Sequence, residues 1–207
     1  FTNDLKRPSY ALGIRQQLAG LLKRAAQGKR QRLLVIGGGA NGTEFVAEVA
    51  SMVNLAVRRG VITRDRVMLS LVGRDTEPLS MLPPLLRRRT VRRLHALGVR
   101  YEGRLTLAAV RDGSALLQSV ENGIPVGTSK SEAFDCCVTA LGVKVPDVVS
   151  ALPFKKNERG RILVDETLRI LGEPAIFGLG DCVALDGKRS DPQTAHAAVY
   201  QSRWVAR

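Results

Sequence analysis

An apolar segment that runs directly into a cluster of glycines constrains the fold of this chain more than any other feature. Residues 33–45 read LLVIGGGANGTEF, in which Gly37, Gly39 and Gly42 are spaced as G-x-G-x-x-G. The apolar run predicts a buried strand, and the apolar periodicity of residues 43–59 predicts a helix after the glycines. This order of strand, glycine loop and helix is typical of an α/β fold with a parallel sheet.

Each glycine of such a loop has a separate purpose. Gly37 allows the tight turn, Gly39 lets a pyrophosphate approach the backbone, and Gly42 lets helix and strand pack closely. The first helical residues, Ala40 and Asn41, would then face the anion with the positive end of the helix dipole. We therefore expect a Rossmann-like domain that binds a dinucleotide, with a purely structural turn as the alternative.

The end of the second expected strand, residues 67–72, bears on which dinucleotide is bound. An acidic residue usually stands there and accepts from the ribose 2′-hydroxyl, but this chain has Gly73 followed by Arg74. A glycine removes the repulsion toward a 2′-phosphate, and an arginine is suited to pair with one. We expect NADPH to be accepted or preferred; the alternative is that Arg74 is a solvated loop residue.

Further elements are expected along the chain. Leucines at helical spacing predict a helix over residues 9–26, and a first-turn proline and a final Gly98 delimit another over 83–98. Residues 99–128 alternate apolar and polar and predict a small antiparallel meander. The remaining expected elements are an apolar strand at 134–141, a hairpin at 158–170, a buried strand at 173–181, and a helix with Asp191 as N-cap and Pro192 next.

The composition favours an anionic partner other than nucleic acid. The formal net charge is +13, which suits phosphorylated cofactors or acidic lipid headgroups. Aromatic residues make up only 4% of the chain, so base-stacking platforms are scarce and we expect no nucleic acid partner. No apolar run approaches the length of a membrane span.

The three cysteines indicate a reducing compartment such as the cytoplasm, because their number is odd and no secretion signal is evident. Cys136 and Cys137 are neighbours in an expected strand, so their side chains point to opposite faces. That arrangement makes neither a CxxC redox pair nor a metal clip. We expect buried structural thiols.

Several motifs occur in an order that resembles a known family. They are VIGGGANGTEFVAEVA, TALGVKVPD, RGRILVDETLRI, IFGLGDCVAL and PQTAHAAVYQ. In this order the chain resembles the FAD-dependent pyridine nucleotide-disulfide oxidoreductases, and most closely the type II NADH dehydrogenases (NADH:quinone oxidoreductases). The resemblance implies a connecting helix at residues 1–30, an NAD(P)H-binding domain at 31–142, and the C-terminal portion of an FAD-binding domain at 143–207.

The resemblance also implies site residues. Glu44 matches a glutamate beside the nicotinamide, and Gly142 matches the glycine where the chain crosses back to the FAD domain. Gly180 and Asp181 lie in the GLGD motif, whose aspartate accepts from flavin ribityl hydroxyls. His196 stands where the family has glutamine, near the flavin and quinone. This replacement argues against quinone as the acceptor. The alternative is that His196 is a histidine on the helix surface beside the flavin pocket.

The activity implied is hydride transfer from NADH or NADPH to FAD, with electrons passed to a quinone or another small acceptor. Such chemistry needs no protein nucleophile and no metal. The family also suggests a homodimer and peripheral contact with the inner face of the cell membrane. Because no second glycine fingerprint precedes residue 37, we expect a fragment that is inactive by itself.

A function of another class is a non-catalytic NAD(P)-binding module that uses a basic surface to bind a protein or an anionic membrane. Five arginines of the 83–98 helix motivate this alternative: Arg87, Arg88, Arg89, Arg92 and Arg93. A solvated helix face is the simpler reading of the same residues, and His95 is expected to be solvated as well.

Overall fold

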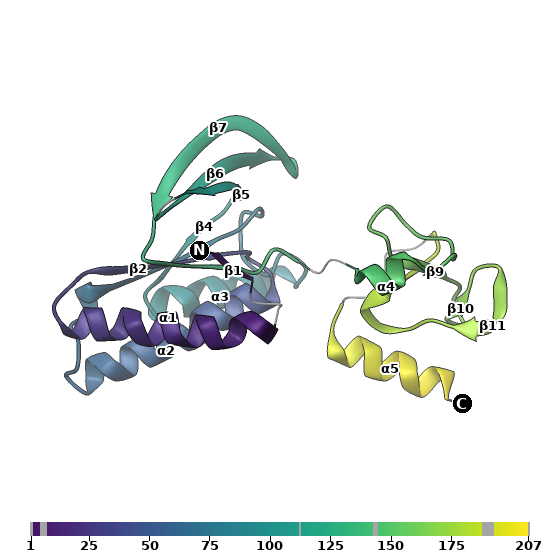
Figure 1. Ribbon diagram of the computed structural model, residues 1–207, viewed down its shortest axis with the longest axis horizontal. Coiled ribbons are helices and arrows are strands. Elements are labelled where there is room, and N and C mark those ends of the chain that lie inside the picture. Colours follow the sequence, from purple (N-terminus) through teal and green to yellow (C-terminus); the bar gives the residue numbers. More distant parts are fainter. Residues whose placement is uncertain (1, 5–7, 112, 143–144, 188–192, 207) are drawn as a thin grey trace. The chain divides into compact units, whose positions relative to one another are not determined.

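The computed structural model describes residues 2–4, 8–111, 113–142, 145–187 and 193–206. The chain divides into two compact units, residues 1–142 and 143–207, which are described separately below (Figure 1). The predicted α/β class, with a parallel sheet and a separate antiparallel meander, is confirmed. Within these described ranges, every helix falls short of the length and hydrophobicity needed for a transmembrane span.

A five-stranded parallel sheet forms the centre of the first unit. Its spatial order is β1-β8-β2-β3-β4, and every neighbouring pair runs parallel. All five strands therefore end at one edge of the sheet, where α/β proteins place their ligands. The strands span β1 Thr2–Asp4, β2 Gln31–Ile36, β3 Val67–Val72, β4 Val99–Glu102 and β8 Cys136–Thr139.

Helices cover one face of this sheet. They are α1 (Pro8–Ala26), α2 (Ala40–Arg58) and α3 (Pro84–Ala96), and α1 and α2 lie along the same side in Figure 1. Leu33 and Val35 of β2 are buried in one core with residues from all three helices. Strand β1 thus contributes to the sheet of the first unit, and α1 contributes to its core.

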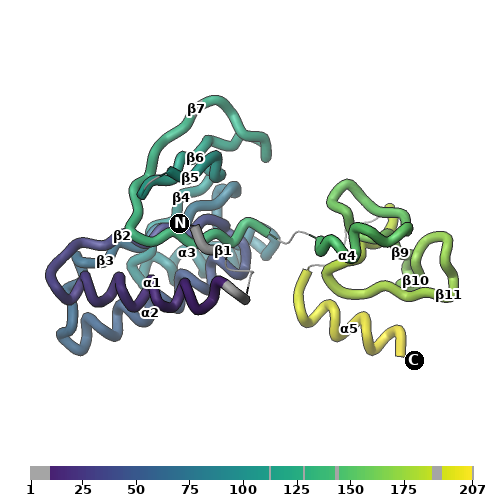
Figure 2. The backbone as a smooth tube through the Cα atoms, viewed as in Figure 1, coloured from purple at the N-terminus to yellow at the C-terminus, as the bar shows by residue number. Residues whose placement is uncertain are grey.

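An antiparallel meander covers the other face. It consists of β5 (Leu105–Arg111), β6 (Ser114–Glu121) and β7 (Ile124–Ala133), and Figure 2 shows it as an arched layer away from α1 and α2. Ala115 and Leu117 pack against Leu34 and Ile36. The prediction that the meander begins at residue 99 was wrong, because β4 instead extends the parallel sheet beside β3.

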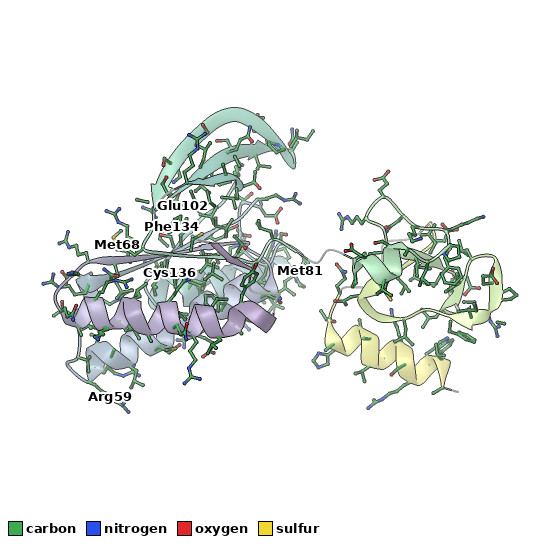
Figure 3. All side chains as sticks on the ribbon, viewed as in Figure 1. Arg59, Met68, Met81, Glu102, Phe134 and Cys136 are labelled. Carbon is green, nitrogen blue, oxygen red and sulfur yellow. The ribbon has the colours of Figure 1, made fainter. Side chains whose placement is uncertain are left out.

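Adjacent cysteines on β8 confirm the alternation of faces. Cys136, labelled in Figure 3, belongs to the core under the helices. Cys137 belongs to the core under the meander. Lys130 of β7 forms an ion pair with Glu102 of β4, so the meander is also joined to the edge of the sheet by charge.

The second unit is built on a four-stranded mixed sheet of order β11-β10-β9-β12. The predicted hairpin is present as an antiparallel β9–β10 pair, and β12 runs parallel to β9. Ile162, Val164 and Ile170 form its small core, with Val205 of the last helix against it. Its elements are α4 Asp147–Ser150, β9 Ile162–Val164, β10 Arg169–Ile170, β11 Glu173–Phe177, β12 Val183–Leu185 and α5 Ala195–Val205.

Two predictions for the second unit were wrong. Strand β11 was expected to be buried, but all five of its residues are exposed, because it is the edge strand and pairs only with β10. The last helix was expected to start with Asp191 as N-cap. It begins at Ala195, and the N-cap is Thr194, whose hydroxyl accepts from the Ala197 N–H at 3.2 Å. Asp191 and Pro192 lie outside the described residues.

Candidate functional site

The glycine loop joins β2 to α2 at the edge where the parallel strands end. Gly37 has a φ of 129°, and a Cβ there would lie 2.3 Å from the Ala140 carbonyl oxygen of the neighbouring chain segment. A Cβ on Gly42 would lie 2.0 Å from the Gly37 carbonyl oxygen. Neither position can carry a side chain, so these glycines are fixed by the tight turn and by the close approach of helix to strand.

Gly39 has a different reason to be glycine. Its φ is −77°, which any residue adopts, and a Cβ on it would meet nothing within 4 Å. The fold itself therefore does not require a glycine here. A bare backbone facing open space is what a ligand needs to approach the main chain closely.

The first turn of α2 presents unpaired donors at the same place. Gly39 is the N-cap and provides no side-chain cap, and the first helical N–H to find a carbonyl is Thr43, 3.0 Å from the Gly39 oxygen. Within the described residues, the N–H groups of Ala40, Asn41 and Gly42 donate to no acceptor. No acidic residue lies in this turn, so the positive end of the helix dipole is not neutralised.

Glu44 lies one turn further along α2 than Ala40, and both are exposed. Because residues four apart share a helix face, Glu44 lies on the same face of α2 as Ala40. The first unit thus brings together six residues that the sequence marks as cofactor-binding candidates: Gly37, Gly39, Ala40, Asn41, Gly42 and Glu44.

The segment after β3 closes against the glycine loop. Leu79 donates its N–H to the Gly38 oxygen at 2.8 Å, and a Cβ on Gly38 would lie 3.5 Å from the Gly73 Cα. The Tyr101 hydroxyl fills the space beside both glycines and donates to the Asp75 carbonyl at 2.7 Å. Burial, followed by the nearby charges of Asp75 and Glu77, raises the pKa of Tyr101 to about 12, so the hydroxyl stays a neutral donor.

Arg74 is exposed and lines a cleft of about 490 Å³ next to this segment. The cleft is polar and lies between the loop after β3, the start of α3 and the turns of the meander. Its lining residues include Arg74, Asp75, Glu77, Arg87, Arg104 and Glu121.

Gly142 is the last residue of the first unit. Its φ of 109° is in the region that favours glycine, while a Cβ there would meet nothing within 4 Å. The glycine is thus required by the direction of the chain as it leaves the unit rather than by a close neighbour.

The predicted residues of the second unit form a group of their own. Gly180 has a φ of 77° and donates its N–H to the Oε1 of buried Gln201 at 2.7 Å, which ties the GLGD turn to α5. Asp181 is exposed, and in the described part of the chain its carboxylate has no partner, although its carbonyl accepts from Gln193 at 3.1 Å. An unpaired carboxylate is thereby held at the N-terminal end of α5.

His196 lies in the first turn of α5 with its side chain exposed. Along the same helix Val199 and Tyr200 are also exposed, at 50% and 71% of their surfaces. Gln201 and Val205 face the small core instead. Helix α5 therefore presents an open surface that is partly apolar, with His196 at its beginning.

A comparison of the sequence with known protein families identifies the family of this chain. The family described as pyridine nucleotide-disulphide oxidoreductase matches residues 11–202, which is nearly the whole chain. The chain belongs to this oxidoreductase family. The resemblance read from the sequence motifs is confirmed at the level of the family.

Several members of the family align with the chain over most of its length. A probable NADH dehydrogenase of Dictyostelium discoideum is 24% identical over 215 residues, covering 99% of this chain and 46% of that protein. The type II NADH:quinone oxidoreductase Ndh of Mycobacterium tuberculosis is 25% identical over 224 residues, covering all of this chain and 46% of that protein. This chain spans about half the length of the curated relatives it matches.

Solved structures share the fold. NDH2 from Plasmodium falciparum, solved in complex with NADH, superposes with a TM-score of 0.73 at 21% identity, covering 91% of this chain and 40% of that one. A water-forming NADH oxidase from Lactobacillus brevis bound to NADH gives a TM-score of 0.68 at 16% identity, covering 99% of this chain and 40% of that one.

Sequence reasoning missed three residues that shape these sites. Tyr101 and Arg104 reach the glycine loop and the cleft only because β4 pairs with β3, and no local pattern marks that pairing. Gln201 lies six residues past Ala195, the first residue of α5, and its contact with Gly180 depends on how the helix lies against the GLGD turn.

Proposed function

We propose that this chain carries the NAD(P)H-binding domain of an FAD-dependent NAD(P)H:quinone oxidoreductase. The observation that carries the proposal is the open face of Gly39 beside the three unpaired N–H groups that begin α2. A strand–glycine–helix turn with these features suits a pyrophosphate. The family and the names of its relatives support the choice of dinucleotide.

The residues of the first unit have distinct parts in this proposal. The N–H groups of Ala40, Asn41 and Gly42 hold the pyrophosphate, and Gly39 leaves room for it. Glu44 lies further along α2, where it would orient the nicotinamide. When both cofactors are bound, the nicotinamide supplies a hydride that FAD receives; the protein's part is to position the rings.

We assign residues 1–30 to the connecting helix, 31–142 to the NAD(P)H-binding domain, and 143–207 to the FAD-binding domain. Gly142 marks the crossing from one to the other. The unpaired carboxylate of Asp181 suits the hydroxyls of the flavin side chain, with Gly180 fixing its turn. In the described residues the N–H groups of Ala195 and His196 also have no acceptor, which suits an electron-rich ring near the start of α5.

A quinone is the proposed electron acceptor. Relatives named for quinone substrates support it, among them a demethylphylloquinone reductase of Synechocystis and a ubiquinone oxidoreductase of Arabidopsis thaliana. We also propose peripheral contact with the inner face of the membrane, supported by the exposed arginines of α3, and a homodimer, supported by the apolar residues exposed on α5. The free cysteines fit a cytoplasmic location.

Substituting Gly39 tests the proposal at the residue that carries it. A Gly39→Ala side chain would point into open space, so the fold should be retained with at most about 1 kcal/mol lost at the N-cap. The added methyl would occupy the place of the pyrophosphate, and the affinity for NADH measured by calorimetry should fall by about tenfold or more.

Gly127→Ala is the matched control. Gly127 lies on β7 in the meander, and a Cβ there also meets nothing within 4 Å. This variant should bind NADH as the unaltered chain does. If Gly39→Ala and Gly127→Ala bind NADH equally well, the glycine loop is not the binding site and the proposal fails.

A further inference from the structure

Backbone hydrogen bonds join the end of β3 to the turn between β4 and β5. Gly73 donates to the Glu102 oxygen and accepts from the Leu105 N–H, both at 3.0 Å. Arg104 donates its N–H to the Asp75 oxygen at 3.3 Å. The two segments are therefore held together, and they place Arg74 and Arg104 in the lining of one cleft.

Gly73 stands where a Rossmann-like domain usually has an acidic residue. A Cβ on Gly73 would lie 2.5 Å from the Tyr101 hydroxyl oxygen and 3.2 Å from the Gly38 Cα. Because Tyr101 is held by its bond to Asp75, an aspartate or glutamate at position 73 would have to displace it. The packing around Gly73 thus leaves no room for the carboxylate that usually accepts from a ribose 2′-hydroxyl.

Two of the three acids that line the cleft already have partners within its lining. The carboxylate of Asp75 accepts from the Ser80 hydroxyl at 2.6 Å, and that of Glu77 lies 3.5 Å from the Arg87 Nε. By contrast, among the residues that the structure describes, the guanidinium groups of Arg74 and Arg104 have no hydrogen bond and no ion pair. Glu121 is the one lining acid in that part of the chain without a partner.

From this arrangement we infer that Arg74 and Arg104 bind the 2′-phosphate of NADPH, so that NADPH is preferred over NADH. The inference rests on the proposed function, because a pyrophosphate at the start of α2 brings the adenosine ribose over the end of β3. Two exposed guanidinium groups can form charge-assisted hydrogen bonds with a 2′-phosphate. The 2′-hydroxyl of NADH carries no charge and cannot form such bonds.

The test measures the affinity of the 207-residue chain for NADPH and NADH by calorimetry. The unaltered chain should bind NADPH about tenfold or more tightly than NADH, and adenosine 2′,5′-bisphosphate more tightly than AMP by a similar factor. Arg74→Gln and Arg104→Gln should each weaken NADPH binding by about tenfold and leave NADH binding unchanged.

Two further variants sharpen this test. Arg88→Gln removes an exposed arginine of α3 that does not line the cleft, and it should leave both affinities unchanged. Glu121→Gln removes the repulsive charge and should tighten NADPH binding alone. Thermal unfolding checks that each exposed substitution leaves the chain folded.

The outcomes separate the inference from the proposed function. If NADH and NADPH bind with equal affinity, or if NADPH affinity is unaffected in both arginine variants, the 2′-phosphate site is refuted and the dinucleotide site stands. If neither nucleotide nor its adenosine half binds to the folded chain, the proposed function fails and the inference fails with it.

Discussion

At the scale of single residues, the neighbouring cysteines of β8 show how one strand serves two cores. Cys136 is 2% exposed under the helices, and Cys137 is fully buried under the meander. Burial raises the pKa of Cys136 to about 11 and that of Cys137 to about 12. The folded chain keeps these protons to higher pH than the unfolded chain, so their contribution to stability is lost as pH rises above about 9.

Thiol labelling checks this assignment. At pH 8 a thiol with a pKa near 11 is ionised on the order of one part in a thousand, and burial blocks the reagent as well. Cys182 is only half-buried. We expect a single fast reaction with Ellman's reagent in the folded chain, lost in Cys182→Ser and kept in Cys136→Ser. Fast labelling of folded Cys182→Ser would contradict the assignment.

The sequence predicts a residue's role when the elements that require the residue are neighbours along the chain. Gly37, Gly39 and Gly42 were identified because the strand, the turn and the helix that need them are contiguous. Tyr101 was not, because its place beside Gly38 and Gly73 comes from the pairing of β4 with β3, a contact between distant segments.

At the scale of elements, α3 separates its two faces by charge. Leu94 and Leu97 pack into the core under the helices, while Arg88, Arg89 and two further arginines face outward. Within the described residues, the outward arginines have no ion pair, whereas Arg87 pairs with Glu77. The unpaired positive charge on this surface of α3 is complementary to anionic lipid headgroups.

Vesicle sedimentation measures whether α3 binds anionic lipid. Replacing Arg88, Arg89, Arg92 and Arg93 together by Gln should weaken binding to phosphatidylserine-containing vesicles by nearly three orders of magnitude, at about 1 kcal/mol per arginine. The matched control replaces four scattered exposed arginines: Arg15, Arg30, Arg59 and Arg111. Equal losses in both variants would mean that net charge, and not α3, carries the binding.

The elements themselves were predicted best where hydropathy changes sharply. The predicted strand at residues 67–72 coincides with β3, and the predicted helix at 9–26 differs from α1 by one residue. Residues 99–102 were placed in the meander because their alternation does not show which neighbour they pair with. Strand β11 has an apolar sequence, but its position at the sheet edge leaves it exposed.

At the scale of the whole molecule, the chain consists of two units with separate cores. The first contains a complete five-stranded sheet that is covered on both faces, by helices and by the meander. The second has a smaller core under a four-stranded sheet. The dinucleotide site proposed here lies within the first unit alone, so the chain should bind the nucleotide without a contribution from the second.

The central claim is that the start of α2 holds a nicotinamide dinucleotide, and amide NMR of the 22.5 kDa chain tests it most directly. On titration with NADH, the amide resonances of Ala40, Asn41 and Gly42 should shift most, because their N–H groups bond the pyrophosphate. The Gly127 amide should stay in place. If saturating NADH leaves the three α2 resonances unmoved, the claim is contradicted.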